Sequence, residues 1–258
     1  MRVLGLDFET TVVDPFDATK MRITEIGAIL WDTATNKPLQ IFSQSVWGAD
    51  YVWHPLMEEI TGLTEAEHKE FGSDPKETLK KLIQLISEAL KEPSGNLLTE
   101  TIIVAHNGKN FDKIVFEKEC ERHDLVAPKI HWVDSISDIP YPKKIDVRKL
   151  AYLGPAHGFL NPFSHRAIFD VLTMLKVMSN YDFEKILSRS KEPDVTVQSK
   201  ISPPFGNTAE KGKKEVEEAK ARGFKFDAAN KIWVKRIKES EYSDEATNCP
   251  WPVVIVRQ

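Results

Sequence analysis

Two carboxylates stand two residues apart at the end of the first predicted strand. Residues 2–10 have two largely apolar faces up to Asp7, which predicts an internal strand. Asp7 and Glu9 point to the same face, because side chains alternate along a strand. Two acids this close repel each other unless a cation lies between them, and hard oxygen ligands suit Mg²⁺ or Mn²⁺. The pair therefore predicts a divalent metal site.

The same tripeptide occurs a second time, as Asp182-Phe183-Glu184. Its context predicts a helix, in which residues i and i+2 point about 200° apart. Two carboxylates arranged in this way cannot share an ion. The second pair is therefore not expected to bind a metal.

Three further residues could complete a metal-dependent site. Asp112 follows a buried strand predicted over 101–106 and opens a helix, so it is either a metal ligand or an ordinary helix N-cap. His165 ends a loop, and Asp170 lies on the first turns of a helix predicted over 167–178. A lone histidine near a helix start is more often structural. This spacing nevertheless suits a mobile general base beside a fixed metal ligand.

Taken in order, these motifs resemble the DEDDh group of DnaQ-like 3′→5′ exonucleases. The first motif is Asp7-Phe8-Glu9-Thr10, the second contains Asp112, and the third pairs His165 with Asp170. The resemblance extends over residues 1–187. Each motif is weak by itself, and their order carries the resemblance.

Other segments support the same resemblance. Thr24–Ala28 and Ile60–Thr64 match the family, and Arg166 stands where a sister group has a tyrosine, so the histidine assignment holds. The loop His106–Asn110 is one residue longer than usual. The segment Asp134–Phe163 resembles phage and prophage members, and the chain as a whole resembles exodeoxyribonuclease X-like proteins.

The resemblance implies a two-metal hydrolase. Two divalent cations, Mg²⁺ or Mn²⁺, would clamp the attacking and leaving oxygens of a phosphodiester. His165 would take the proton from the attacking water as general base. Cleavage at a 3′ end would release nucleoside 5′-monophosphates. The implied metal ligands are Asp7, Glu9, Asp112 and Asp170.

Contacts to the terminal nucleotide are implied for residues beside these acids. Glu9 and the backbone after it could meet the terminal ribose 3′-hydroxyl, which would explain end-specific cleavage. Phe111 is expected either to stack on a terminal base or to pack in the core. The implied substrate-binding residues are Thr10, His106, Asn107 and Phe111.

The expected function is a metal-dependent 3′→5′ exonuclease that acts on DNA with a free 3′ end. Two alternatives use the same motifs: an enzyme that trims RNA, and a proofreading subunit bound to a polymerase or another replication or repair partner. The complete set of four acids and a histidine argues against a non-catalytic binding module. The net charge of -4 argues against coating nucleic acid through bulk charge, and leaves open contact through bound metal ions.

The elements that must position these residues predict an α/β fold. A turn at Asn36–Pro38 joins two strands into an antiparallel hairpin, and Asp74 with Pro75 begins an amphipathic helix that ends at Pro93–Asn96. With the resemblance, this order predicts an RNase H-like mixed five-stranded sheet flanked by helices. Strands are expected over 2–10, 23–31, 39–47 and 101–106, and further helices over 112–123 and 167–178.

A change of composition near Ser188 predicts a second module. Residues 1–190 are expected to form the exonuclease domain, and residues 191–258 a linker plus a small basic α+β module. The linker is predicted over 188–210, where prolines and serines gather. A helix over 209–222 and a hairpin over 224–237 are expected to follow.

The segment Lys211–Lys238 carries 10 basic and 4 acidic residues, so it could contact a nucleic-acid backbone. Phe224, Phe226 and Trp233 are interleaved with these charges and could stack on bases. The alternative is a solvated charged helix that caps a small aromatic core.

Length and composition bound the class of protein. A chain of 258 residues with 41% hydrophobic residues forms one large domain or two modest ones and excludes global disorder. Two cysteines cannot build a disulfide framework, and no apolar run approaches the ~20 residues of a membrane span. No signal peptide is visible, so the expected location is the cytoplasm, or the host cytoplasm if a phage encodes the protein.

Overall fold

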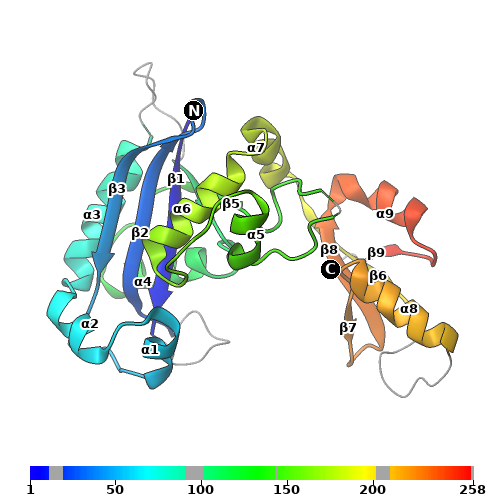
Figure 1. Ribbon diagram of the computed structural model, residues 1–258, viewed down its shortest axis with the longest axis horizontal. Helices are drawn as coiled ribbons and strands as arrows, with labels where there is room; N and C mark the ends of the chain where they lie inside the picture. Colours follow the sequence, from blue (N-terminus) through cyan, green and yellow to red (C-terminus); the bar gives the residue numbers. More distant parts are fainter. Residues whose placement is uncertain (12–19, 91–100, 143, 202–209, 257–258) are drawn as a thin grey trace. The chain divides into compact units, whose positions relative to one another are not determined.

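Two compact units make up the protein (Figure 1). One comprises Met1–Pro140 and Val147–Ser190, and the other comprises Tyr141–Asp146 and Lys191–Gln258. The computed structural model describes residues 1–11, 20–90, 101–142, 144–201 and 210–256.

A mixed five-stranded sheet forms the centre of the larger unit, with strand order β3-β2-β1-β4-β5. β2 is antiparallel to both β1 and β3, whereas β4 is parallel to both β1 and β5. The predicted α/β fold with a mixed five-stranded sheet is confirmed. The strands are β1 (Arg2–Thr10), β2 (Ile23–Asp32), β3 (Lys37–Ser45), β4 (Thr101–Ala105) and β5 (Ile130–Asp134).

Helices cover both faces of this sheet (Figure 1). The predicted N-cap of α3 is confirmed, because Asp74 accepts a hydrogen bond from the backbone of Glu77 at 2.9 Å. Its predicted end at residues 93–96 lies outside the described residues. No helix among the described residues is long and apolar enough to cross a membrane. The helices are α1 (Pro55–Thr61), α2 (Glu65–Phe71), α3 (Pro75–Glu88), α4 (Asp112–Arg122), α5 (Leu150–Ala156), α6 (Ala167–Met178) and α7 (Phe183–Lys191).

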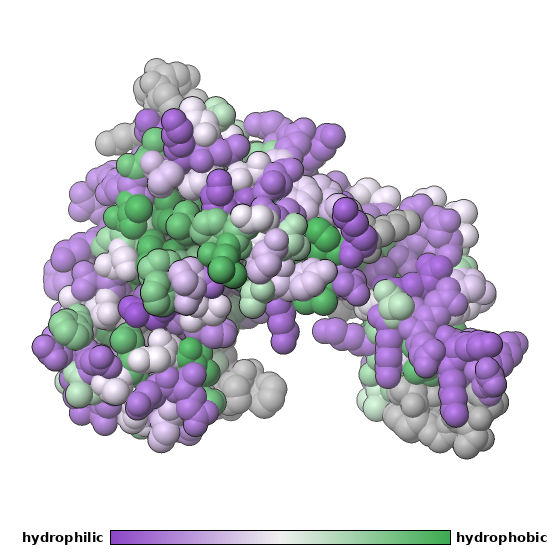
Figure 2. Space-filling model, viewed as in Figure 1, coloured by the Kyte–Doolittle hydropathy of each residue, from purple (hydrophilic) through white to green (hydrophobic). Residues whose placement is uncertain are grey.

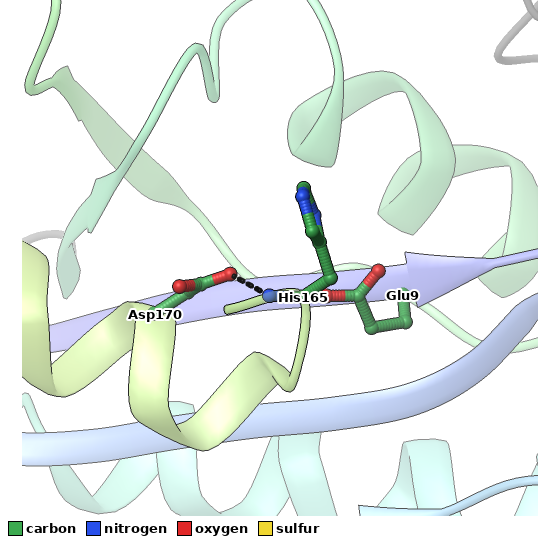
Figure 3. A group of neighbouring side chains, drawn as sticks. All are labelled: Glu9, His165 and Asp170. Atoms are coloured by element: carbon green, nitrogen blue, oxygen red, sulfur yellow. Dashed lines mark hydrogen bonds between the residues drawn. The ribbon is translucent and has the colours of Figure 1, made fainter. Parts of the chain in front are cut away.

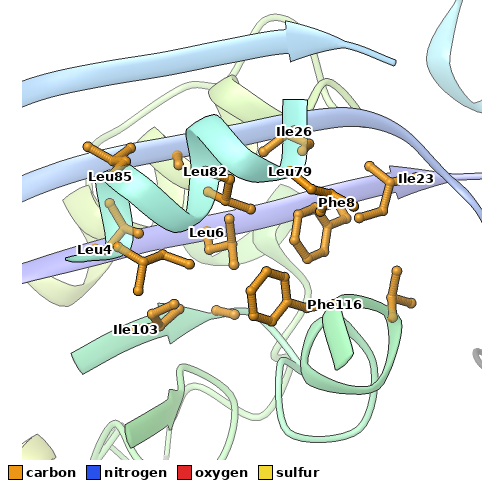
Figure 4. Packing of buried hydrophobic residues seen from close by; sticks show 14 of the residues in the cluster. Leu4, Leu6, Phe8, Ile23, Ile26, Leu79, Leu82, Leu85, Ile103 and Phe116 are labelled. Carbon is orange, nitrogen blue, oxygen red and sulfur yellow. The ribbon is translucent and has the colours of Figure 1, made fainter. Parts of the chain in front are cut away.

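The main core lies on one face of β1. Leu4, Leu6 and Phe8 alternate along the strand and are buried against α3 and α4 (Figure 4). Phe8 also stacks on Phe116 of α4, with ring centroids 6.4 Å apart. Because side chains alternate, Asp7 and Glu9 lie on the opposite face of the same strand. The apolar residues that hold β1 in place are thus kept apart from its two carboxylates.

The smaller unit is an antiparallel four-stranded sheet, with strand order β7-β8-β6-β9. Phe224 and Trp233 are buried in its core, so the interpretation that they stack on bases is wrong. The exposed side of α8 is hydrophilic (Figure 2). The elements are β6 (Asp194–Ser199), α8 (Glu210–Ala221), β7 (Lys225–Asp227), β8 (Ile232–Lys238), a 3₁₀ turn (Glu239–Glu241), α9 (Tyr242–Asn248) and β9 (Val254–Val256).

The prediction of a linker over 188–210 is wrong for residues 188–199, most of which belong to a helix and a strand. α7 continues to Lys191, and β6 occupies Asp194–Ser199, while residues 202–209 lie outside the described residues. Val195 and Val197 contribute to the core of the smaller unit. Their period of two is the strand signal, and the surrounding prolines and serines obscured it.

Candidate active site

Strand β1 presents Asp7 and Glu9 on the face of the sheet that α6 covers. Both side chains are half-buried. Across the antiparallel pairing with β2, Asp7 lies opposite Gly27 and Glu9 lies opposite Glu25. The two carboxylates predicted to share a face therefore do so, with a third carboxylate beside Glu9.

The close approach of α6 to the sheet brings Asp170 to these carboxylates. A Cβ atom built on Gly27 would lie 2.4 Å from the backbone carbonyl carbon of Ala167, so only glycine leaves room for the start of α6. Gly5 likewise lies under Val171 and Leu175. Asp170, in the first turn of α6, is buried as a result.

Asp170 and His165 are joined by a hydrogen bond within one short segment of the chain, next to Glu9. The two oxygens of Asp170 accept hydrogen bonds from Asn161 Nδ2 at 2.7 Å and from the backbone N–H of His165 at 2.9 Å. His165 has a left-handed backbone with φ of 62°. Its ring stands away from the carboxylate of Asp170 (Figure 3). A backbone contact, rather than an imidazole contact, therefore joins these two residues.

Glu9, His165 and Asp170 could hold one metal ion together. Each offers one ligand atom, and these atoms lie within 4.8 Å of one another. Glu9 is half-buried, His165 is exposed and Asp170 is buried. An exposed imidazole beside these carboxylates can either bind a metal ion or exchange a proton with a nearby water molecule.

Asp112 reaches the same region from the start of α4. Its Oδ1 accepts a hydrogen bond from the backbone N–H of Phe8 at 3.2 Å, which ties α4 to β1. Its Oδ2 is buried and has no hydrogen-bond partner among the described residues. The N-cap of α4 is Phe111, so the interpretation of Asp112 as an ordinary N-cap is wrong. A buried carboxylate oxygen without a donor fits a cation ligand.

The electrostatics of the cluster also favour a bound cation. Burial raises the pKa of Asp7 well above its usual range, and the charges of Asp112, Glu9 and Asp170 raise it further. Burial, with the charges of Asp170 and Glu25, raises the pKa of Glu9 to about 8. Burial raises the pKa of Asp112 to about 7. Without a cation, Glu9 stays largely protonated at pH 7 and Asp112 about half protonated, and a divalent ion would displace these protons.

The predicted nucleotide contacts have different surroundings. Thr10 is half-buried, and its hydroxyl donates to the sulfur of Met21 at 3.4 Å. His106 bonds the hydroxyl of Ser135 at 2.8 Å, and burial lowers its pKa to about 4, so its ring is neutral near pH 7.

The other two predicted contacts lie on the loop between β4 and α4. Asn107 is exposed and has a left-handed backbone with φ of 64°. Phe111 is half-buried and packs against the main core. Core packing therefore accounts for Phe111.

Three residues that the sequence did not single out support the site. Asn161 holds Asp170, and Glu25 pairs with Arg166 at 2.8 Å. The backbone N–H groups of Asn107, Lys109 and Ile136 donate to Asp134, which fixes the loop before Asp112. Glu25 had one available signal, because it is a charged residue within an otherwise apolar strand. No short-range pattern identifies Asn161 or Asp134.

The metal-free protein is expected to become more stable as the pH falls from about 8.5 to about 5.5. The folded pKa values of Glu9 and Asp112, about 8 and 7, lie above the ordinary values of 4.5 and 3.8. The folded state therefore binds more protons than the unfolded state across this range, which stabilises it as the pH decreases. Between about pH 8.5 and about pH 5.5 the unfolding temperature in EDTA should therefore rise by at least ~3 °C. A rise of this size corresponds to a gain of roughly 1 kcal/mol in the free energy of unfolding.

Thermal melts in EDTA and in Mn²⁺ at three pH values check this expectation. Mn²⁺ should raise the unfolding temperature most at pH 8.5, where it relieves the greatest repulsion between carboxylates. A melting temperature in EDTA that does not change with pH, or that falls as the solution is acidified across this range, would contradict it.

Solved structures of nucleases share this fold. E. coli exonuclease I in complex with a dA16 oligonucleotide matches with a TM-score of 0.57 and 17% identity, over 80% of this chain and 49% of exonuclease I. Another exonuclease I structure gives a TM-score of 0.58 at 17% identity. The nuclease domain of 3′hExo, a DEDDh family member bound to rAMP, gives 0.55 at 19% identity, over 69% of this chain and 90% of that one.

These likenesses confirm the expected RNase H-like fold. This chain spans about half the length of exonuclease I. A comparison with protein-family models found no match, and a comparison with curated proteins found no relative.

Proposed function

We propose that this protein is a metal-dependent 3′→5′ exonuclease that hydrolyses terminal phosphodiesters of DNA. The grouping of Glu9, Asp170 and the exposed His165 around one possible ion supports it most directly. Asp7 and Asp112 interact electrostatically with this group, and one oxygen of Asp112 is buried without a hydrogen-bond donor among the described residues. DNA is favoured because the likeness to exonuclease I, whose structures include DNA oligonucleotides, extends over 80% of this chain, against 69% for 3′hExo.

Asp7, Glu9, Asp112 and Asp170 would hold two divalent cations, Mg²⁺ or Mn²⁺. When bound, these ions would neutralise the phosphate and make a bound water more acidic. His165 would accept the proton of that water at a ring nitrogen, since its ring is exposed beside Glu9 and Asp170. Water would attack the terminal phosphorus and break its bond to the 3′-oxygen of the preceding nucleotide. The terminal nucleotide would leave as a nucleoside 5′-monophosphate, and the shortened strand would keep a 3′-hydroxyl.

We assign this reaction to residues 1–190 and treat residues 191–258 as a separate module. The narrower resemblance to phage and exodeoxyribonuclease X-like proteins belongs to the same proposal. The proposal also includes a polymerase or repair protein as a binding partner, for the case in which the exonuclease acts in proofreading.

Incubation with 5′-labelled single-stranded DNA, duplex DNA and RNA of one sequence tests the proposal. Each substrate is combined with Mg²⁺, Mn²⁺ or EDTA and the products are separated by length. A ladder that shortens from the 3′ end of DNA, and that EDTA abolishes, is the expected result. Faster degradation of RNA would overturn the choice of DNA. No degradation of any substrate would overturn a free-standing nuclease and favour a subunit that works with a polymerase.

A further inference from the structure

Arg166 places a positive charge beside the carboxylate cluster. It directly follows His165 and precedes α6, and its Nε donates to Glu25 Oε2 at 2.8 Å. Glu25 is 2% exposed and lies opposite Glu9 in the pairing of β1 with β2. The guanidinium is therefore held at the edge of the site by a buried anchor.

The charges around Arg166 show which groups it faces. Burial and neighbouring carboxylates raise the pKa of Glu9, and the positive charge of Arg166 lowers it. The positive charge of Arg166 also acts on α2: burial and then this charge lower the pKa of His68, and hydrogen bonds from Thr64 and then this charge lower the pKa of Glu67. The charge of Arg166 thus acts on a carboxylate of β1 and on two side chains of α2.

Most hydrogen-bonding capacity of Arg166 is unused. A guanidinium has five N–H donors, and Glu25 takes only the one on Nε. The two terminal amino groups have no hydrogen-bond partner among the described residues, and the side chain is 33% exposed. Glu25 already holds Nε, so the planar pair of terminal amino groups is oriented in advance for an external oxygen acid.

A phosphate is the ligand that fits this arrangement. Its oxygens match the fork of a guanidinium with two parallel hydrogen bonds, and a fixed fork loses little entropy on binding. Glu9 and Asp170 give the metal-free site an acidic surface, and a fixed cation at its edge adds to the attraction that bound metal ions would exert on an anion.

We propose that Arg166 binds a phosphate of the nucleic-acid strand beside the metal-ligand carboxylates, and that Glu25 holds it in that orientation. This inference rests on the proposed function, since it names a substrate contact of the same site. The competing interpretation is purely structural: the ion pair would only brace the left-handed turn at His165.

Single methylphosphonate replacements separate these interpretations. The full chain is mixed, in Ca²⁺ instead of Mg²⁺, with labelled single strands that each carry one neutral methylphosphonate, and gels confirm that the strands stay intact. Fluorescence anisotropy gives Kd for the wild type, Arg166→Gln, Arg166→Lys and Lys80→Gln. Lys80 is a matched control, because it is an exposed cation of α3, which packs against the other face of the sheet.

The proposal predicts a position-specific result. Arg166→Gln should raise Kd for the unmodified strand about tenfold, as for the loss of a charged hydrogen bond. The slope of log Kd against log salt should fall by about 0.7, which corresponds to one phosphate of a single strand. At one position, the wild type should lose affinity on methylphosphonate replacement while Arg166→Gln does not. Arg166→Lys should keep part of the affinity, and Lys80→Gln should match the wild type.

Two outcomes would overturn the inference in different ways. If Arg166→Gln and Arg166→Lys keep the wild-type dependence on every methylphosphonate, Arg166 contacts no phosphate and is a structural brace. If the wild type neither binds nor degrades any nucleic acid, the proposed function itself fails. Thermal melts of each variant show whether it is folded, and Arg166→Lys keeps the test decisive if Arg166→Gln unfolds.

Discussion

Replacing Asp7 with asparagine is expected to abolish hydrolysis and to stabilise the metal-free protein. Burial of Asp7 raises its pKa, and the charges of Asp112, Glu9 and Asp170 raise it further. The amide removes one metal ligand, and metal ions supply several kcal/mol to such reactions, so the rate should fall by at least about 10³-fold. It also removes an acid whose ionisation is opposed by burial and by neighbouring charges, so at about pH 8.5 in EDTA the unfolding temperature should rise by about 2–4 °C per kcal/mol gained.

The chain offers a matched control for this substitution. Asp182-Phe183-Glu184 repeats the tripeptide of the site, but Asp182 is exposed and accepts the backbone N–H of Glu184 at the start of α7. Asparagine also serves at such a position, so Asp182→Asn should keep both activity and stability. Initial rates on 5′-labelled DNA and melts in EDTA measure both effects. An Asp7→Asn protein with wild-type rates would contradict the assignment of Asp7 as a metal ligand.

Replacing His165 with asparagine is expected to lower kcat by about 10²–10⁴-fold, the usual contribution of a general base. Metal binding should change little, because Asp7, Glu9, Asp112 and Asp170 remain. Asparagine is the sharper substitution here, since it tolerates the left-handed backbone that His165 adopts. His165→Ala adds a backbone penalty to the same chemical loss.

Single-turnover rates across a pH range, together with melts with and without Mn²⁺, separate the two roles of this residue. A loss of rate with an unchanged Mn²⁺-dependent rise in melting temperature indicates a base. A reduced rise would assign His165 to metal binding instead. Full activity in both His165→Asn and His165→Ala would show that another group takes the proton.

The elements that carry the candidate site were predictable because their signals are local. β1 has the predicted bounds Arg2–Thr10, and α6 has the predicted bounds Ala167–Met178. Alternation placed Asp7 and Glu9 on one face, and the helical period placed Asp170 near the start of α6. In each case one short stretch of sequence contains both the residue and the pattern that positions it.

What could not be predicted depends on contacts between distant segments. Glu25 and Arg166 are 141 residues apart, and Asp134 meets the Asn107 loop across 27 residues. No periodicity encodes such pairs. β6 was missed for a different reason, because it is a short strand in a segment whose prolines and serines favour irregular structure.

The two faces of β1 separate the tasks of folding and chemistry. Leu4, Leu6 and Phe8 pack into the apolar core, and Asp7 and Glu9 face α6 across backbone contacts at Gly27. Apolar exchanges on the core face can therefore accumulate over generations while the spacing of the carboxylates is kept. Gly27 has no such freedom, because any side chain there would push α6, and Asp170 with it, off the sheet. The one exception on the core face is Phe8, since it stacks on Phe116 of α4, the helix that carries Asp112.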